Sequence, residues 1–252
     1  MKVNKKLSLI FSVLFTLALF ILYFISNNLD KENLTDVNLG YALDGDTIKT
    51  LDGKTLRLAN INAPEKGEQG YDEAGSFLNT YFNKTVQVVF LGKDKYGREL
   101  VKIYSPDYIN LKIVKEGHAS KFLVSDKEVR IFSKAEKEAI ENERGMWKLS
   151  PFYNCIKGKI NPKEEYVMLT YICEGNMPEG LWIKDESRSK FNLPPAKNKK
   201  LKIISGKGDN KIDIVYWNGE AHIWNDDRDT LYVFDSDAKL VYYKSYGYYG
   251  YG

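Results

Sequence analysis

Histidine and cysteine are scarce in this sequence, which contains two of each among 252 residues. Neither type occurs between residues 44 and 98, the segment in which acidic and basic motifs cluster. This absence argues against a zinc site in that segment. An excess of charge is lacking as well, because residues 31–150 contain 19 basic and 19 acidic side chains. A polyanionic partner must then be bound by local charge and not by a bulk positive field.

The N-terminal segment lacks the Ala-x-Ala pattern that is typical of signal-peptide cleavage. Lys2, Lys5 and Lys6 precede an apolar run over residues 7–25, which is long enough to span a bilayer. We therefore expect residues 1–26 to form a signal anchor, a transmembrane helix that holds the chain in the cell membrane with its bulk extracellular. Residues 27–38 would form a polar tether. The alternative is cleavage of the anchor and secretion of the remainder.

Two segments of alternating character, residues 47–51 and 54–59, flank an Asp-Gly pair. This pattern predicts a hairpin with a two-residue turn, because both turn positions tolerate positive φ. Such a turn would place Ile48 opposite Arg57. Asp46 would then lie on the same face of the sheet as Arg57, as a diagonal neighbour.

Further polar residues follow the hairpin. Pro64 cannot donate to a sheet ladder, so the strand through Asn62 should end there and Glu65 should begin a loop nearby. The amide of Asn62 and the carboxylate of Asp46 offer the oxygen ligands that a hard cation such as calcium needs. Glu65 is left as a general base.

Arginine presents a planar fork that matches two phosphate oxygens at once. Arg57 lies in an otherwise apolar strand, and Arg98 follows a Tyr-Gly turn. Both are therefore candidates for binding the charge of a phosphoryl group.

These motifs resemble, in their order, the staphylococcal nuclease-like (thermonuclease) family over about residues 43–147. The resemblance implies an α+β domain at residues 39–150, a five-stranded OB-like barrel with helices. It also implies calcium-dependent hydrolysis of single-stranded or frayed DNA or RNA to 3′-phosphate products. The motifs are Asp44-Gly45-Asp46-Thr47, Arg57, Asn62-Ala63-Pro64-Glu65 and Asp94-Lys95-Tyr96-Gly97-Arg98.

The family mechanism assigns catalysis to Arg57, Glu65 and Arg98. Calcium and both arginines would bind the scissile phosphate, while Glu65 activates a water for in-line attack at phosphorus. The calcium ligands would be Asp46, Asn62 and the backbone carbonyl of Ala63, and the substrate-binding residues would be Lys95 and Tyr96.

Two departures from the family pattern stand out. Asn62 occupies the position of a second calcium carboxylate, and Ala63 that of a common Thr, so one negative charge is lost. Residues 121–124 read Lys-Phe-Leu-Val where the best-known members carry tyrosines that stack on the base.

Residues 153–243 are expected to form a second domain. About residues 156–243 of it resemble a lamin tail domain. The resemblance implies an all-β immunoglobulin-like sandwich without a catalytic set, whose ligand is unknown. Residues 244–252, rich in tyrosine and glycine, should form a flexible tail. The segments that carry the resemblance are residues 164–169, 180–185, 223–226 and 229–234.

Cys155 and Cys173 are placed symmetrically about residue 164. If the flanking segments form an antiparallel hairpin, the two cysteines fall opposite each other and can form a disulfide. An extracellular location would favour that bond. The alternative is two independent buried thiols.

Two functions other than nuclease activity remain open. The charge lost at Asn62 leaves room for a nucleic-acid-binding protein that does not cleave. The sandwich could also dominate, as an envelope attachment module that carries a passenger nuclease. Retention of Glu65 together with Arg57 and Arg98 favours the enzyme.

Overall fold

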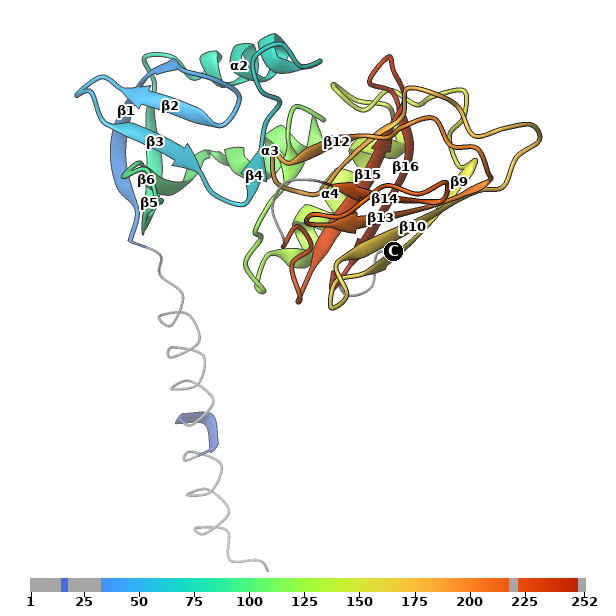
Figure 1. The fold of residues 1–252 in the computed structure, drawn as a ribbon. Coiled ribbons are helices and arrows are strands. Elements are labelled where there is room, and N and C mark those ends of the chain that lie inside the picture. Colours follow the sequence, from blue (N-terminus) through green and yellow to red (C-terminus); the bar gives the residue numbers. More distant parts are fainter. Residues whose placement is uncertain (1–14, 18–32, 218–221, 249–252) are drawn as a thin grey trace, which may run out of the picture. The chain divides into compact units, whose positions relative to one another are not determined.

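The computed structural model describes residues 15–17, 33–217 and 222–248 (Figure 1). Residues 1–35 and residues 36–252 form two separate compact units. Of the predicted signal anchor, residues 15–17 are helical and the remainder lies outside the described residues. Within the described ranges, the structure contains no helix that is long and apolar enough to cross a membrane.

A closed barrel of five strands forms the first part of the larger unit. Its strands are β1 (Thr35–Ala42), β2 (Thr47–Thr50), β3 (Thr55–Leu58), β5 (Thr85–Lys93) and β6 (Glu99–Ser105). They follow the order β3-β2-β1-β5-β6, and a parallel pairing of β3 with β6 closes the barrel. The expected OB-like barrel is thus confirmed, and β1 includes residues 35–38 of the predicted tether. Fully buried side chains that fill the barrel include Leu56, Leu58, Val88 and Val101.

Three helices and two short strands accompany the barrel. The helices are α2 (Tyr71–Asn79), α3 (Ile109–Lys115) and α4 (Val129–Glu141), and each contributes apolar side chains to the barrel core. The strands β4 (Ile61–Asn62) and β8 (Ser120–Lys121) pair antiparallel, and β7 (Asp107–Tyr108) extends the sheet beyond β6. As predicted, β4 ends before Pro64.

The predicted register of the β2–β3 hairpin is wrong by one residue. Arg57 lies opposite Thr47. The turn contains the three residues 51–53, because the amide of Thr50 donates to the carbonyl of Lys54 at 3.0 Å. A two-residue turn would instead have placed residue 51 opposite Lys54.

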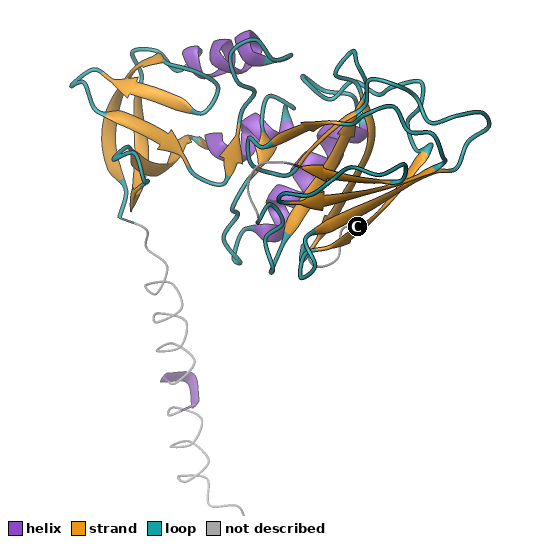
Figure 2. Ribbon diagram, in the orientation of Figure 1, coloured by secondary structure: helices purple, strands orange, loops and turns teal. Residues whose placement is uncertain are grey.

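Two four-stranded sheets follow the barrel (Figure 2). Their buried side chains form one shared core, which is consistent with the predicted all-β sandwich. The pairing of β13 with β14 is parallel, and the segment 223–226 forms no strand, so the immunoglobulin-like and lamin tail assignments stay predictions. One sheet contains β9 (Ile156–Asn161), β10 (Tyr166–Tyr171), β13 (Lys200–Ser205) and β14 (Ile214–Trp217), and the other β11 (Trp182–Lys184), β12 (Lys190–Asn192), β15 (Asp229–Phe234) and β16 (Leu240–Tyr246).

Cys155 and Cys173 are joined by a disulfide, with their Cα atoms 5.2 Å apart. The strands β9 and β10 form the expected antiparallel hairpin. The amide of Ile172 donates to the carbonyl of Cys155 at 2.8 Å, so Cys173 lies one residue beyond the position directly opposite Cys155. The bond therefore crosses the end of the hairpin diagonally.

The barrel and the sandwich share a buried contact. The ring of Trp147 stacks on that of Tyr232, with centroids 5.5 Å apart. The expected boundary near residues 150–153 therefore separates two segments that pack into one compact unit. The predicted flexible tail is part of this unit as far as residue 248, because β16 reaches Tyr246 and the side chain of Tyr248 is buried.

Candidate active site

A bend at residues 44–46, directly before β2, turns the side chain of Asp46 into the interior. Because Asp46 precedes the strand, the alternation of strand faces does not apply to it, and its Oδ2 lies 3.1 Å from Nη2 of Arg57. The predicted contact is present although the predicted register is not. A Cβ atom at Gly45 would lie 2.4 Å from that of Ala74, so glycine lets α2 pack against the bend.

The guanidinium of Arg57 is buried and held by several acceptors. Its Nη2 donates to the carbonyl of Ile61 at 2.8 Å and to Oδ1 of Asn62 at 2.6 Å. Burial lowers the pKa of Arg57, and the carboxylate of Asp46 opposes that shift. Burial likewise raises the pKa of Asp46, in spite of Arg57. The negative charge of Asp46 is therefore only partly compensated.

Asp46 and Asn62 fit a hard cation in their chemistry. One oxygen of each contacts the same Nη2 of Arg57, and carboxylate and amide oxygens are the ligand types that calcium takes. Among the described residues, no group of three or more His, Cys, Asp and Glu side chains is arranged to hold a metal. The fit thus depends on an amide and on backbone oxygens in addition to Asp46.

Glu65 follows β4 and is about half exposed. Its Oε1 forms an ion pair with Nε of Arg188, and Nη2 of Arg188 lies 3.7 Å from Oδ2 of Asp46. The residue Arg188 belongs to the sandwich, between β11 and β12. Arg188 was not among the predicted site residues, since no sequence motif distinguishes it from other surface arginines.

The turn between β5 and β6 positions Arg98. Its Nε donates to Oδ2 of Asp94 at 2.7 Å, and its Nη1 donates to Oγ1 of Thr47 at 3.4 Å. The side chain of Tyr96 at the tip of the turn is 71% exposed, with Nζ of Lys95 5.1 Å from the ring centroid. Lys95 and Tyr96 are therefore available to a ligand.

A cleft of about 890 Å³ joins these elements. Arg57, Arg98 and Arg188 all line it, together with Tyr96 and the segment 122–123. Lys121, the first residue of the segment 121–124 that departs from the family pattern, does not line the cleft. It is fully buried, and its Nζ lies 2.5 Å from Oε2 of Glu136. The cleft thus combines three guanidinium groups with exposed apolar and aromatic surface, which suits a phosphate-bearing chain with planar bases.

Comparison with known proteins gives a consistent result. Residues 55–149 match the family described as "Staphylococcal nuclease homologue". Two proteins of Escherichia coli, one from O157:H7, are each described as "Uncharacterized endonuclease" and are 33% identical over 111 residues, which cover 42% of this chain and 72% of theirs. A Haemophilus influenzae protein of the same description is 33% identical over 110 residues, 41% of this chain and 61% of its own. The matched segment contains every predicted site residue of the barrel except Asp46, which precedes it. The chain belongs to the staphylococcal nuclease homologue family.

Proposed function

We propose that this chain is a nuclease that hydrolyses phosphodiester bonds in single-stranded or frayed DNA or RNA. The observation that carries the proposal is the cleft onto which Arg57 and Arg98 open, beside the carboxylates of Asp46 and Glu65. Membership of a nuclease family and the description of its relatives as endonucleases support the same conclusion.

The two arginines of the barrel would bind the scissile phosphate. Arg57 is fixed by its bonds to Ile61 and Asn62, so its orientation costs little at the moment of reaction. Arg98 is fixed by Asp94 and approaches the cleft from a different strand. Together they can stabilise the charge that develops on the phosphoryl oxygens.

Glu65 would act as the general base that removes a proton from the attacking water. Attack in line with the 5′ oxygen breaks the bond between phosphorus and that oxygen, which leaves as a 5′-hydroxyl, and the phosphate stays on the 3′ oxygen of the other fragment. Oε1 of Glu65 is ion-paired with Arg188 in this structure, and release of that contact would make the carboxylate a stronger base.

Calcium is the metal we propose for this site, with Asp46, Asn62 and the backbone carbonyl of Ala63 as its ligands. When bound, such a cation would neutralise charge on the phosphate and polarise it toward attack. One oxygen of Asp46 and one of Asn62 contact Nη2 of Arg57 in this structure, so calcium would have to use their remaining oxygen lone pairs or replace those contacts.

We further propose that the chain is held in the cell membrane by residues 1–26 and acts outside the cell. The apolar run at residues 7–25 supports this location. The disulfide between Cys155 and Cys173 supports it as well, because such bonds persist in oxidising compartments.

The test is the Glu65→Gln variant. A positioned general base contributes about 10²–10⁴-fold to rate, so the variant should lose activity on single-stranded DNA and RNA by that factor. Wild-type protein should also lose activity when calcium is removed by a chelator. The cleavage rate of a labelled oligonucleotide measures both effects.

The matched control is Glu68→Gln, which removes a carboxylate three residues away that is ion-paired with Lys190. This variant should keep its activity: Oε2 of Glu68 accepts from the amide of Glu65 at 3.0 Å, and the side-chain oxygen of a glutamine can keep that bond. Retention of wild-type turnover by Glu65→Gln, or full activity in excess chelator, would disprove the mechanism. Binding without cleavage by the wild type would instead favour the non-cleaving alternative.

A further inference from the structure

The cleft is built by both halves of the larger unit. The loop of residues 185–189, between β11 and β12 of the sandwich, supplies part of its wall through Ser187, Arg188 and Ser189. Arg188 is thus the third guanidinium that lines the cleft, and it follows Glu65 by 123 positions in the sequence.

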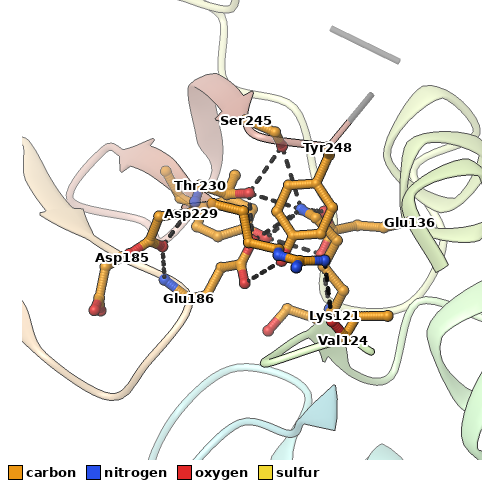
Figure 3. Close-up of polar contacts among 12 residues, drawn as sticks. Lys121, Val124, Glu136, Asp185, Glu186, Asp229, Thr230, Ser245 and Tyr248 are labelled. Atoms are coloured by element: carbon orange, nitrogen blue, oxygen red, sulfur yellow. Dashed lines mark hydrogen bonds and ion pairs between the residues drawn. The ribbon is translucent and has the colours of Figure 1, made fainter. Parts of the chain in front are cut away.

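The loop is held firmly at its base. Oδ1 of Asp185 accepts hydrogen bonds from the amide and the hydroxyl of Ser187, at 3.0 and 2.7 Å. The amide of Glu186 donates to Oδ1 of Asp229 at 3.2 Å, and the carbonyl of Glu186 accepts from Nδ2 of Asn62 at 2.8 Å. Figure 3 shows Asp185, Glu186 and Asp229, of which Glu186 lies 3.3 Å from Nζ of the buried Lys121. The position of Arg188 is therefore fixed relative to the barrel.

The side chain of Arg188 remains accessible. It is 46% exposed, although it contacts Glu65 and lies 3.7 Å from Asp46. A guanidinium carries five N–H donors, and these two carboxylates do not use all of them. The remaining donors are available in the cleft that Arg57 and Arg98 also line.

We propose that Arg188 is a third phosphate-binding residue, so that the sandwich completes the substrate cleft of the barrel. The inference rests on the proposed function. An incoming phosphodiester competes with Glu65 for the guanidinium, because both are anions that match its planar fork. Arg188 then binds the phosphate, and the same exchange releases Glu65 to act as a base.

The experiment measures binding separately from cleavage. Full-length protein in detergent, carrying Glu65→Gln to suppress cleavage, is titrated with a fluorescent oligothymidylate at several salt concentrations in chelator. Adding Arg188→Ala should weaken binding by about tenfold, as expected for a hydrogen bond to a charged group. The slope of log K against log salt should fall by about 0.7, the loss of one phosphate contact on a single strand. Both proteins carry the Glu65→Gln substitution, so removal of Arg188 exposes no carboxylate at position 65 that could repel the oligonucleotide. The difference in affinity then reports the loss of Arg188 itself.

Two further variants sharpen the result. Arg188→Lys should keep the salt slope, since it keeps the charge, but should bind more weakly than the parent because it lacks the fork. Lys190→Ala removes a neighbouring cation of the sandwich that is ion-paired with Glu68. It should leave both affinity and slope unchanged, because Lys190 does not line the cleft.

Unchanged affinity and slope in the Arg188→Ala protein would overturn the inference. Faster cleavage by Arg188→Ala in the Glu65 background, with unchanged binding, would also overturn it and would assign Arg188 to blocking Glu65. A wild type that binds but never cleaves would remove the proposed nuclease function, while a binding defect in Arg188→Ala would still support this inference. Circular dichroism of each variant checks that it is folded.

Discussion

The amide of Asn62 contacts both halves of the larger unit. Its Oδ1 accepts from Arg57, and its Nδ2 donates to the backbone carbonyl of Glu186 at 2.8 Å. A carboxylate has no donor for that carbonyl. The departure from the family's aspartate therefore has a physical reason in this structure: asparagine satisfies an acceptor of the sandwich as well as the arginine.

Asn62→Asp should accordingly destabilise the protein when metal is absent. A carboxylate oxygen would face the carbonyl of Glu186, at a cost of about 1–3 kcal/mol for the unsatisfied group. The added charge should nevertheless tighten calcium binding if residue 62 is a ligand. Thermal unfolding in chelator measures the first effect, and calorimetric titration with calcium measures the second. An unchanged melting temperature would show that the contact with Glu186 contributes little, and unchanged calcium affinity would show that residue 62 is not a ligand.

At the scale of elements, the β2–β3 hairpin shows how a turn sets a register. Gly53 has φ of 88°, in the left-handed region. The hydroxyl of Thr50 donates to Oδ1 of Asp52 at 2.5 Å and accepts from the amide of Lys54 at 2.9 Å. These bonds stabilise a three-residue turn, whereas the Asp-Gly pair alone predicts a two-residue turn.

Gly53→Ala should destabilise the protein by about 1 kcal/mol, because a Cβ disfavours the left-handed conformation. No atom outside the adjacent residues lies within 4 Å of the added Cβ, so steric contact does not contribute. Gly53→Asn is the matched control and should cost less, since asparagine tolerates this conformation. Urea unfolding of the three proteins measures the difference. Equal stability of the alanine and glycine proteins would contradict the assigned turn.

At the scale of the whole molecule, a buried charged network joins the barrel to the sandwich (Figure 3). Nζ of Lys121 lies 2.5 Å from Oε2 of Glu136 and 3.3 Å from Oε1 of Glu186, and donates to Oγ1 of Thr230 at 2.7 Å. Burial disfavours the charge of Lys121, but the two glutamates outweigh that effect and raise its pKa. The ring of Tyr248 covers the amine, with its centroid 4.6 Å away.

Deletion of residues 153–252 should therefore destabilise the barrel. The truncated chain would expose Trp147 and would leave Lys121 without its partners on the sandwich. Breaking a buried charge network by removing some partners costs about 3–5 kcal/mol, to which the loss of apolar contact adds. Thermal unfolding and size-exclusion chromatography of the truncated protein measure the effect. A truncated chain as stable as the full one would show that the two halves fold independently.

The sequence by itself determined the local chemistry. The bend containing Asp46, the arginine of β3 and the loop after Pro64 are short-range features, since each depends on residues close together in the chain. They were sufficient to predict the contact between Asp46 and Arg57 and the candidate site, whereas the barrel was predicted from the family that their order resembles. The register of the hairpin was missed because a side chain outside the Asp-Gly pair, Thr50, selects the turn.

Only the tertiary structure decided what completes the cleft. Three contributions come from the sandwich: Arg188, the carbonyl of Glu186 that Asn62 satisfies, and Thr230 beside Lys121. The hydrogen bond from Asn62 to Glu186 spans 124 positions and that from Lys121 to Thr230 spans 109. A lysine read in sequence is expected at the surface, because burying a charge is costly unless partners compensate it. Those partners come near Lys121 only when two distant segments of the chain pack together. The sequence therefore predicted the site residues of the barrel but not the residues of the sandwich that surround them.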